Sequence, residues 1–218
     1  MSVSKDRILF EDDHLLAVNK LSGELVVKGK GKVEKLPLFD FLKKEYPGLR
    51  TLHRLDFETS GVVAFARTKQ TYDAIRKNDF ADWKKVYHTL VMGRIGRTSG
   101  EIRKPLAARS GKGAVEALTR YKILDRFANS SYVEAEIETG RHHQIRKHFA
   151  SIGHPLALDT VYGHEKFNRL FTKELRFKKF FLHASCVDLV HPVTGEKITI
   201  EASLPKPFSA VLKTLRSL

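Results

Sequence analysis

The sequence predicts a single α+β domain that spans residues 1–218, and three observations lead to this class. A chain of 218 residues allows one large domain or two small ones. Hydrophobic residues make up 42% of it, which is enough for a core and excludes disorder of the whole chain. Segments with strand and helix patterns follow one another without a repeat or an obvious linker, so one domain is the simplest interpretation.

Strands are predicted where apolar residues alternate with polar ones, or run without interruption between turn residues. Residues 61–68 are rich in Val, Phe and Ala and indicate a buried strand. Residues 131–138 alternate polar and apolar side chains, which is the period of a half-buried strand. The other predicted strands are residues 8–10, 14–19, 86–92, 118–124, 180–190 and 197–202.

Helices are predicted where apolar residues recur at helical spacing and a turn residue follows. Residues 38–46 fit this pattern and stop at Pro47-Gly48. A helix over 142–152 places Ile145, Phe149 and Ile152 on one buried stripe and ends at Gly153. Residues 69–80 and 206–218 are the other predicted helices.

The charge balance points to a polyanionic partner. The chain carries 39 Lys and Arg against 25 Asp and Glu, a formal net charge of +14, which favours nucleic acid first and anionic lipid second. The alternative is a soluble basic protein whose excess charge serves no polyanionic partner. Two segments concentrate cations: the Lys/Gly loop at 28–32 and the long connector at 93–117. The connector is a candidate RNA contact, with a mobile surface loop or an extra hairpin as alternatives.

Cysteine content and hydropathy indicate a cytoplasmic protein. The single cysteine, Cys186, excludes an intramolecular disulfide and a cysteine-based zinc site, and suits a reducing compartment. The charged N-terminal segment fits no signal peptide. The longest strongly apolar stretch, residues 61–66, is far below the roughly 20 residues that span a bilayer, so we expect no membrane association.

The first candidate site is His53-Arg54-Leu55-Asp56, which is followed by Thr59-Ser60-Gly61 just before the buried strand. A carboxylate in such a turn can be kept ionised by a neighbouring cation and by backbone N–H groups. The alternative is that Asp56 caps a turn and Arg54 lies on the surface.

The second candidate site is the segment 139–148. Gly140 permits a turn, and a helix that begins there offers free N–H groups beside Arg141 and Arg146, which suits a phosphate or a carboxylate. Arg146 is adjacent to Ile145 of the apolar stripe, so its side chain should emerge near the edge of the buried face. A cation in that position needs a partner of opposite charge, and Asp56 is the candidate. His148 lies six residues after His142 and five after His143, and neither spacing stacks two imidazoles on one helical face, so no metal site is predicted.

Two further segments carry weaker signals. Tyr87 follows two lysines in a predicted strand, where its polar tip could face an anionic site, although a strand tyrosine usually packs in the core. Leu182-His183-Ala184 is an apolar strand with one histidine, which is most often a core residue.

Together and in this order, these segments resemble the RluA-type pseudouridine synthase family over about residues 8–205. The resemblance is carried by Asn19-Lys20, Ser22-Gly23, His53-Arg54-Leu55-Asp56, Thr59-Ser60-Gly61, Lys85, Tyr87, Thr139-Gly140-Arg141, His143-Gln144-Ile145-Arg146, His148, Gly153-His154-Pro155, Asp159, Tyr162-Gly163, Leu182-His183-Ala184 and His191-Pro192. Three positions depart from it: Leu21 replaces the usual Pro, His142 a Thr or Ser, and Leu158 a Gly. These departures bear on substrate choice more than on chemistry.

The resemblance implies a mixed, largely antiparallel sheet flanked by helices, and an enzyme that isomerises uridines of transfer or ribosomal RNA to pseudouridine. It implies no cofactor, no metal and a flipped target base. Asp56 would be the catalytic carboxylate and Arg146 its partner. Tyr87 would lie against the target base and help to move a proton. We also expect a monomer without a separate N-terminal RNA-binding domain.

The remaining site residues have binding roles by the same resemblance. Leu182 would pack beneath the pocket, and Arg54 would fill the gap that the flipped nucleotide leaves. His53, Arg141 and Gln144 would contact RNA. The alternatives are a non-catalytic RNA-binding protein of the same fold, a hydrolase in which Asp56 activates water, and a structural protein associated with the ribosome.

Overall fold

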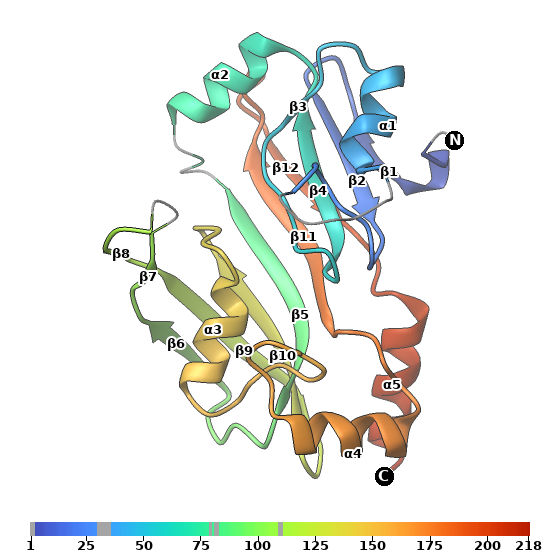
Figure 1. The fold of residues 1–218 in the computed structure, drawn as a ribbon. Coiled ribbons are helices and arrows are strands. Elements are labelled where there is room, and N and C mark those ends of the chain that lie inside the picture. Colours follow the sequence, from blue (N-terminus) through green and yellow to red (C-terminus); the bar gives the residue numbers. More distant parts are fainter. Residues whose placement is uncertain (1–2, 30–35, 79, 81–82, 109–110) are drawn as a thin grey trace. The chain divides into compact units, whose positions relative to one another are not determined.

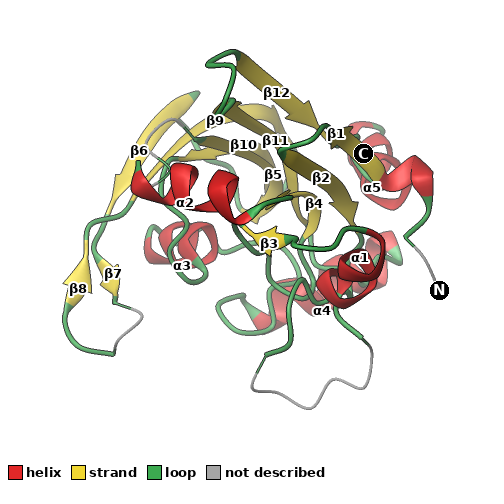
Figure 2. Cartoon of the chain, turned by 90° about the horizontal axis from the view of Figure 1, so that it is seen from above, coloured by secondary structure: helices red, strands yellow, loops and turns green. Residues whose placement is uncertain are grey.

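The computed structural model describes residues 3–29, 36–78, 80, 83–108 and 111–218 (Figure 1). They form two compact units, one of residues up to 84 together with 184–203, the other of residues 85–183 together with 204–218. In each unit, strands paired into an antiparallel arrangement are flanked by helices (Figure 2), which confirms the predicted α+β class. The residues 30–32 of the predicted Lys/Gly loop lie outside the described part.

The first unit contains a sheet in the strand order β1-β2-β4-β11-β12, with β3 paired to β4. Its strands are β1 (Ile8–Glu11), β2 (Leu15–Lys20), β3 (Arg50–Thr51), β4 (Ser60–Ala66), β11 (Leu182–Val190), which enters this unit at Ala184, and β12 (Lys197–Glu201). Its helices are the 3-10 helix η1 (Lys5–Arg7), α1 (Leu38–Glu45) and α2 (Lys69–Lys77).

Helices α1 and α2 cover opposite faces of β4, because successive side chains of a strand point to opposite sides. Phe39 of α1 stacks on Phe65 with ring centroids 6.3 Å apart. Ile75 of α2 packs in the core cluster that contains Val62 and Ala64. β4 is therefore buried along its whole length, as the uninterrupted apolar run predicts.

The second unit contains the antiparallel order β5-β10-β9-β6 and a separate two-stranded ribbon, β7-β8. Its strands are β5 (Lys84–Met92), which enters this unit at Lys85, β6 (Ser99–Arg103), β7 (Leu106–Ala107), β8 (Ala114–Val115), β9 (Leu118–Arg126) and β10 (Ser130–Ile137). Its helices are α3 (Gln144–Ser151), α4 (Glu165–Leu175) and α5 (Lys206–Arg216).

The strand register decides which side chains of this second sheet share a face. Tyr87 of β5 lies opposite Ala135 of β10, which lies opposite Tyr121 of β9, so all three point to one side. Phe149 of α3 packs on Tyr121 with ring centroids 5.6 Å apart. Helix α3 therefore covers the sheet face that carries Tyr87.

The opposite face of this sheet is covered by α4 and α5. Leu90 and Tyr132, which lie opposite each other in the register, belong to an apolar cluster with Phe171 of α4 and Phe208 of α5. Tyr132 is thus buried, although the alternation in 131–138 predicts a polar position there. Aromatic side chains of the two helices supply the cover that the strand pattern alone does not show.

The structure refines the description of two predicted segments. The connector at 93–117 contains β6, β7 and β8, so the alternative of additional hairpin structure is confirmed there. Helix α3 begins at Gln144 and ends at Ser151, so Ile152 lies beyond it and is 40% exposed. The prediction that Ile152 belongs to the buried stripe is wrong for that reason.

Helix α4 is the longest element of the described structure that the sequence analysis does not predict. Its signal is present, since Phe167, Leu170 and Phe171 recur at helical spacing, and the His164 side chain accepts a hydrogen bond from the Phe167 N–H as an N-cap. Histidine is not among the residues preferred at an N-cap, so the sequence carries no strong start signal for this helix.

Candidate active site

Asp56 lies in the loop between β3 and β4 of the first unit. Its side chain is half-buried and that of Arg54 is exposed. The Thr59 N–H donates to the Asp56 carbonyl over 3.2 Å, which closes a turn just before β4. The sequence places the carboxylate correctly in a turn at the entrance of a buried strand.

A buried lysine anchors this loop from behind. Lys20 is fully buried, and its Nζ donates to the carbonyl oxygens of Leu21, Phe57 and Thr59 over 3.0, 3.1 and 2.5 Å. Burial lowers the pKa of Lys20 to about 8, and neighbouring carboxylates, Asp56 among them, oppose that decrease. Three donors of one ammonium group thus match three carbonyls, which holds the loop after Asp56 in place.

The two ends of the loop are held by packing and backbone contacts. His53 Nε2 accepts a hydrogen bond from the Ala64 N–H over 3.1 Å, and its ring meets Trp83 edge-on at 5.8 Å. Gly61 has φ +112°, and a Cβ there would lie 2.1 Å from the Ala184 carbonyl oxygen. Only glycine allows β4 to approach Ala184 so closely. These contacts favour a positioning role for His53 over the RNA contact expected for it.

In the second unit, Tyr87 and Leu182 come to the same side of the sheet. Tyr87 is 7% exposed, and two residues along β5 the Thr89 hydroxyl donates to the Phe181 carbonyl over 2.6 Å. Phe181 points into the apolar cluster on the α4 and α5 side. Because side chains alternate along an extended segment, Leu182 points to the opposite side, where Tyr87 lies.

Arg146 of α3 is buried on that same side and is held by an unexpected partner. Its Nε donates to Asp159 Oδ2 over 2.7 Å and its Nη2 to Asp159 Oδ1 over 2.9 Å, in the bidentate geometry typical of strong Arg–carboxylate pairs. The guanidinium lies over the rings of Tyr162 and Phe180, at 5.3 and 5.0 Å from their centroids. These contacts fix the orientation of Arg146.

Asp159 is kept ionised by the same arrangement. Burial by itself would raise the pKa of Asp159, but hydrogen bonds from Arg146 and from the N–H groups of Tyr162 and Val161 outweigh burial and lower that pKa. Leu158, which stands where the resembled family has Gly, has φ +62°. Leucine is strained in this left-handed conformation, which is held by the hydrogen bond from the Leu158 N–H to Asn168 Oδ1.

The turn before α3 uses Gln144 internally. The Gln144 side-chain oxygen accepts from Thr139 Oγ1 and the Arg141 N–H, and its nitrogen donates to the Leu118 carbonyl and Thr119 Oγ1. These four bonds use the full capacity of the amide, which is 2% exposed. The structure therefore favours a positioning role for Gln144 over an RNA contact, whereas the side chain of Arg141 is exposed.

Comparison with known proteins identifies the family. The model of the RNA pseudouridylate synthase family matches residues 14–151, which is more than half of the chain. The chain belongs to the RNA pseudouridylate synthase family. The predicted isomerase class is thereby confirmed at the level of the family.

Curated proteins similar to the chain support the same assignment. It is 34% identical to ribosomal large subunit pseudouridine synthase D of Nitrosomonas europaea, over 97% of this chain and 66% of the relative. It is 32% identical to ribosomal large subunit pseudouridine synthase C of Vibrio vulnificus, over 98% of this chain and 70% of the relative. The chain thus spans about two thirds of the length of these pseudouridine synthases.

Solved structures show that the pseudouridine synthase fold extends over the chain. Human RNA pseudouridylate synthase domain containing 4 aligns with a TM-score of 0.79 and 25% identity, over 97% of this chain and 93% of the other. Human RNA pseudouridylate synthase domain containing 1 aligns with a TM-score of 0.72 and 23% identity, over 100% of this chain and 98% of the other. The predicted fold is confirmed by this likeness.

Within the pseudouridine synthase fold, the structure brings Tyr87, Leu182 and Arg146 to one face of the second unit. Asp56 lies in the first unit, and its pairing with Arg146 stays a prediction. In the part of the chain that the structure describes, no three His, Cys, Asp or Glu side chains are arranged to hold a metal ion. Nor does any helix there have the length and apolarity to cross a bilayer.

Proposed function

We propose that this chain converts uridine of large-subunit ribosomal RNA to pseudouridine, as a cytoplasmic monomer that uses neither cofactor nor metal. The observation that carries the proposal is the buried Arg146, fixed by Asp159 on the sheet face that bears Tyr87 and Leu182. The names of its relatives support the choice of ribosomal RNA over transfer RNA.

The reaction requires a carboxylate because charge develops on the sugar. The C1′–N1 bond breaks, the uracil turns, C1′ bonds to C5, and the proton of C5 is lost while N1 gains one. We assign the carboxylate to Asp56, which acts either by attack on C1′ or at the 2′ position, as carboxylates do in glycoside chemistry. A guanidinium beside it, that of Arg146, would favour its charged form at neutral pH.

The other residues would hold the target nucleotide. A stacked base cannot react, so the uridine is flipped out at a cost of a few kcal/mol, which an RNA loop reduces. Tyr87 and Leu182 would enclose the uracil so that it does not escape after bond cleavage. Arg54, which is exposed, would occupy the gap in the RNA, and Arg141 would contact a phosphate. The +14 net charge supplies affinity for the backbone.

The test is to incubate the purified chain with large-subunit ribosomal RNA and to map the pseudouridines that form. Pseudouridine has the same mass as uridine, and it is detected by its reaction with carbodiimide. We expect product with the native chain, none with Asp56→Asn, and strongly reduced product with Arg146→Ala, while both variants still bind RNA. Full activity of Asp56→Asn would refute the catalytic assignment. Binding without product would favour the non-catalytic RNA-binding protein, and free uracil would favour the hydrolase.

A further inference from the structure

We propose that a basic groove along α4 binds the backbone phosphates of RNA beside the target nucleotide. This inference rests on the proposed function and assigns part of the RNA-binding surface. The groove has a volume of about 550 Å³. We call it the α4 groove, and its lining residues are Leu158, Asp159, Thr160, Gly163, Glu165, Asn168, Arg169, Thr172, Lys173 and Lys178.

One face of α4 forms a wall of this groove. Residues 165, 168, 169, 172 and 173 recur at the i, i+3, i+4 spacing that places side chains on one side of a helix. Arg169 and Lys173 stand one turn apart, about 6 Å along the axis. The lining therefore presents a row of cations along the groove, and Lys178 extends it beyond the helix.

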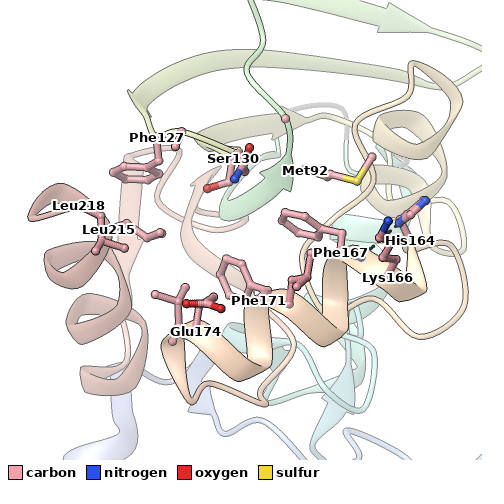
Figure 3. A pocket seen from close by; sticks show the side chains of 15 residues that line it. Met92, Phe127, Ser130, His164, Lys166, Phe167, Phe171, Glu174, Leu215 and Leu218 are labelled. Carbon is pink, nitrogen blue, oxygen red and sulfur yellow. Dashed lines mark hydrogen bonds between the residues drawn. The ribbon is translucent and has the colours of Figure 1, made fainter.

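The opposite face of α4 fixes the helix in this orientation. Phe167 and Phe171 point away from the groove, into an apolar pocket of about 480 Å³ that Leu215 also lines (Figure 3). Phe171 is buried in the cluster with Phe177 and Phe208. Rotation of α4 would expose these rings, so the cationic face is kept at the surface.

The charges of the groove suit a polyanion. Arg169 contacts Glu165 over 3.4 Å, but both side chains are more than 70% exposed, so this ion pair is weak and can be exchanged for a phosphate. Lys173 and Lys178 are exposed and make no ion pair within the described residues. The carboxylate of Asp159 is already neutralised by Arg146. The net charge of the lining is therefore positive.

The groove adjoins the predicted site through direct contacts. Asn168 of α4 accepts from the Leu158 N–H and donates to the Asp159 carbonyl, over 2.8 and 3.0 Å. A Cβ at Gly163 would lie 2.0 Å from that same carbonyl oxygen, so the loop and the helix start are closely packed. Asp159 in turn holds Arg146. Phosphates bound in the α4 groove would thus belong to nucleotides next to the flipped uridine.

The experiment measures binding of a fluorescent, uridine-containing RNA stem–loop at a series of salt concentrations, for the native chain and for Lys173→Gln/Lys178→Gln. Each lost phosphate contact should reduce the slope of log K against log salt by about 0.7–0.9, and affinity about fivefold at 0.1 M salt.

The matched control is Lys206→Gln/Lys213→Gln, which removes two exposed charges from α5 in the same unit. A native slope in this control together with a reduced slope in the groove variant supports the proposal. An unchanged slope in the groove variant, or an equal reduction in both, overturns it. Formation of pseudouridine by the native chain is a separate measurement. If no pseudouridine forms, the proposed function is refuted, while the salt dependence of binding still tests the α4 groove.

Discussion

The buried pair of Arg146 and Asp159 allows a sharp prediction for Asp159→Asn. The side chains are 6% and 0% exposed, so the variant leaves a guanidinium charge with little access to water. An amide nitrogen cannot accept the hydrogen bond that Oδ1 or Oδ2 accepts now. Removal of one partner of a buried ion pair costs about 3–5 kcal/mol, a large part of the typical stability of about 5–15 kcal/mol.

The expected result is a decrease of the melting temperature by about 6–20 °C, since about 1 kcal/mol shifts it by 2–4 °C in a chain of this length. Turnover should fall as well, because Arg146 loses its fixed orientation. Thermal unfolding followed by circular dichroism and pseudouridine formation would measure the two effects. The control is Glu165→Gln, whose exposed pair with Arg169 is worth about 0–1 kcal/mol.

The pH dependence gives a second readout of the same pair. The pKa of Asp159 is lowered in the folded state, so its stabilisation is complete above the unfolded pKa of about 3.9 and is lost as pH falls through the folded value. The stability gap between the native chain and Asp159→Asn should be constant from pH 7 to 5 and shrink below about pH 4. A variant that melts within 1–2 °C of the native chain at pH 7, against the ~6 °C minimum, would refute the reasoning.

Three further predictions concern the loop of Asp56 and the base pocket. Turnover should fall as pH rises through about 8, because burial lowers the pKa of Lys20 to about 8 and its neutral amine has two donors for three carbonyls. Burial also lowers the pKa of Lys85 to about 8, so a fall in turnover that persists in Lys20→Gln would be assigned to Lys85 instead. Gly61→Ala should cost at least about 2 kcal/mol by denaturant unfolding, given the 2.1 Å approach to Ala184, and a native midpoint would contradict this close packing. Tyr87→Phe should lower the single-turnover rate by about 10²–10⁴ with RNA affinity kept, and a native rate would remove the phenol from proton transfer.

The sequence by itself determined the local chemistry of this protein. The turn around Asp56 before a buried strand, the cationic segment before α3 and the amphipathic helices follow from side-chain spacing and turn residues, which act between near neighbours in the chain. The predicted α+β class and the resemblance to pseudouridine synthases rest on such short segments and their order. For that reason both could be read without coordinates.

The tertiary structure alone decided how those segments are held. Arg146 donates a hydrogen bond to Asp159, which lies thirteen residues further along the chain. The Gln144 side chain donates to the Leu118 carbonyl across twenty-six residues, and Lys20 donates to the Thr59 carbonyl. The spacing of residues in the sequence does not predict these contacts. Packing removes the polar groups from water, and each buried polar group then needs a hydrogen-bond partner, which the tertiary fold supplies from a distant part of the chain.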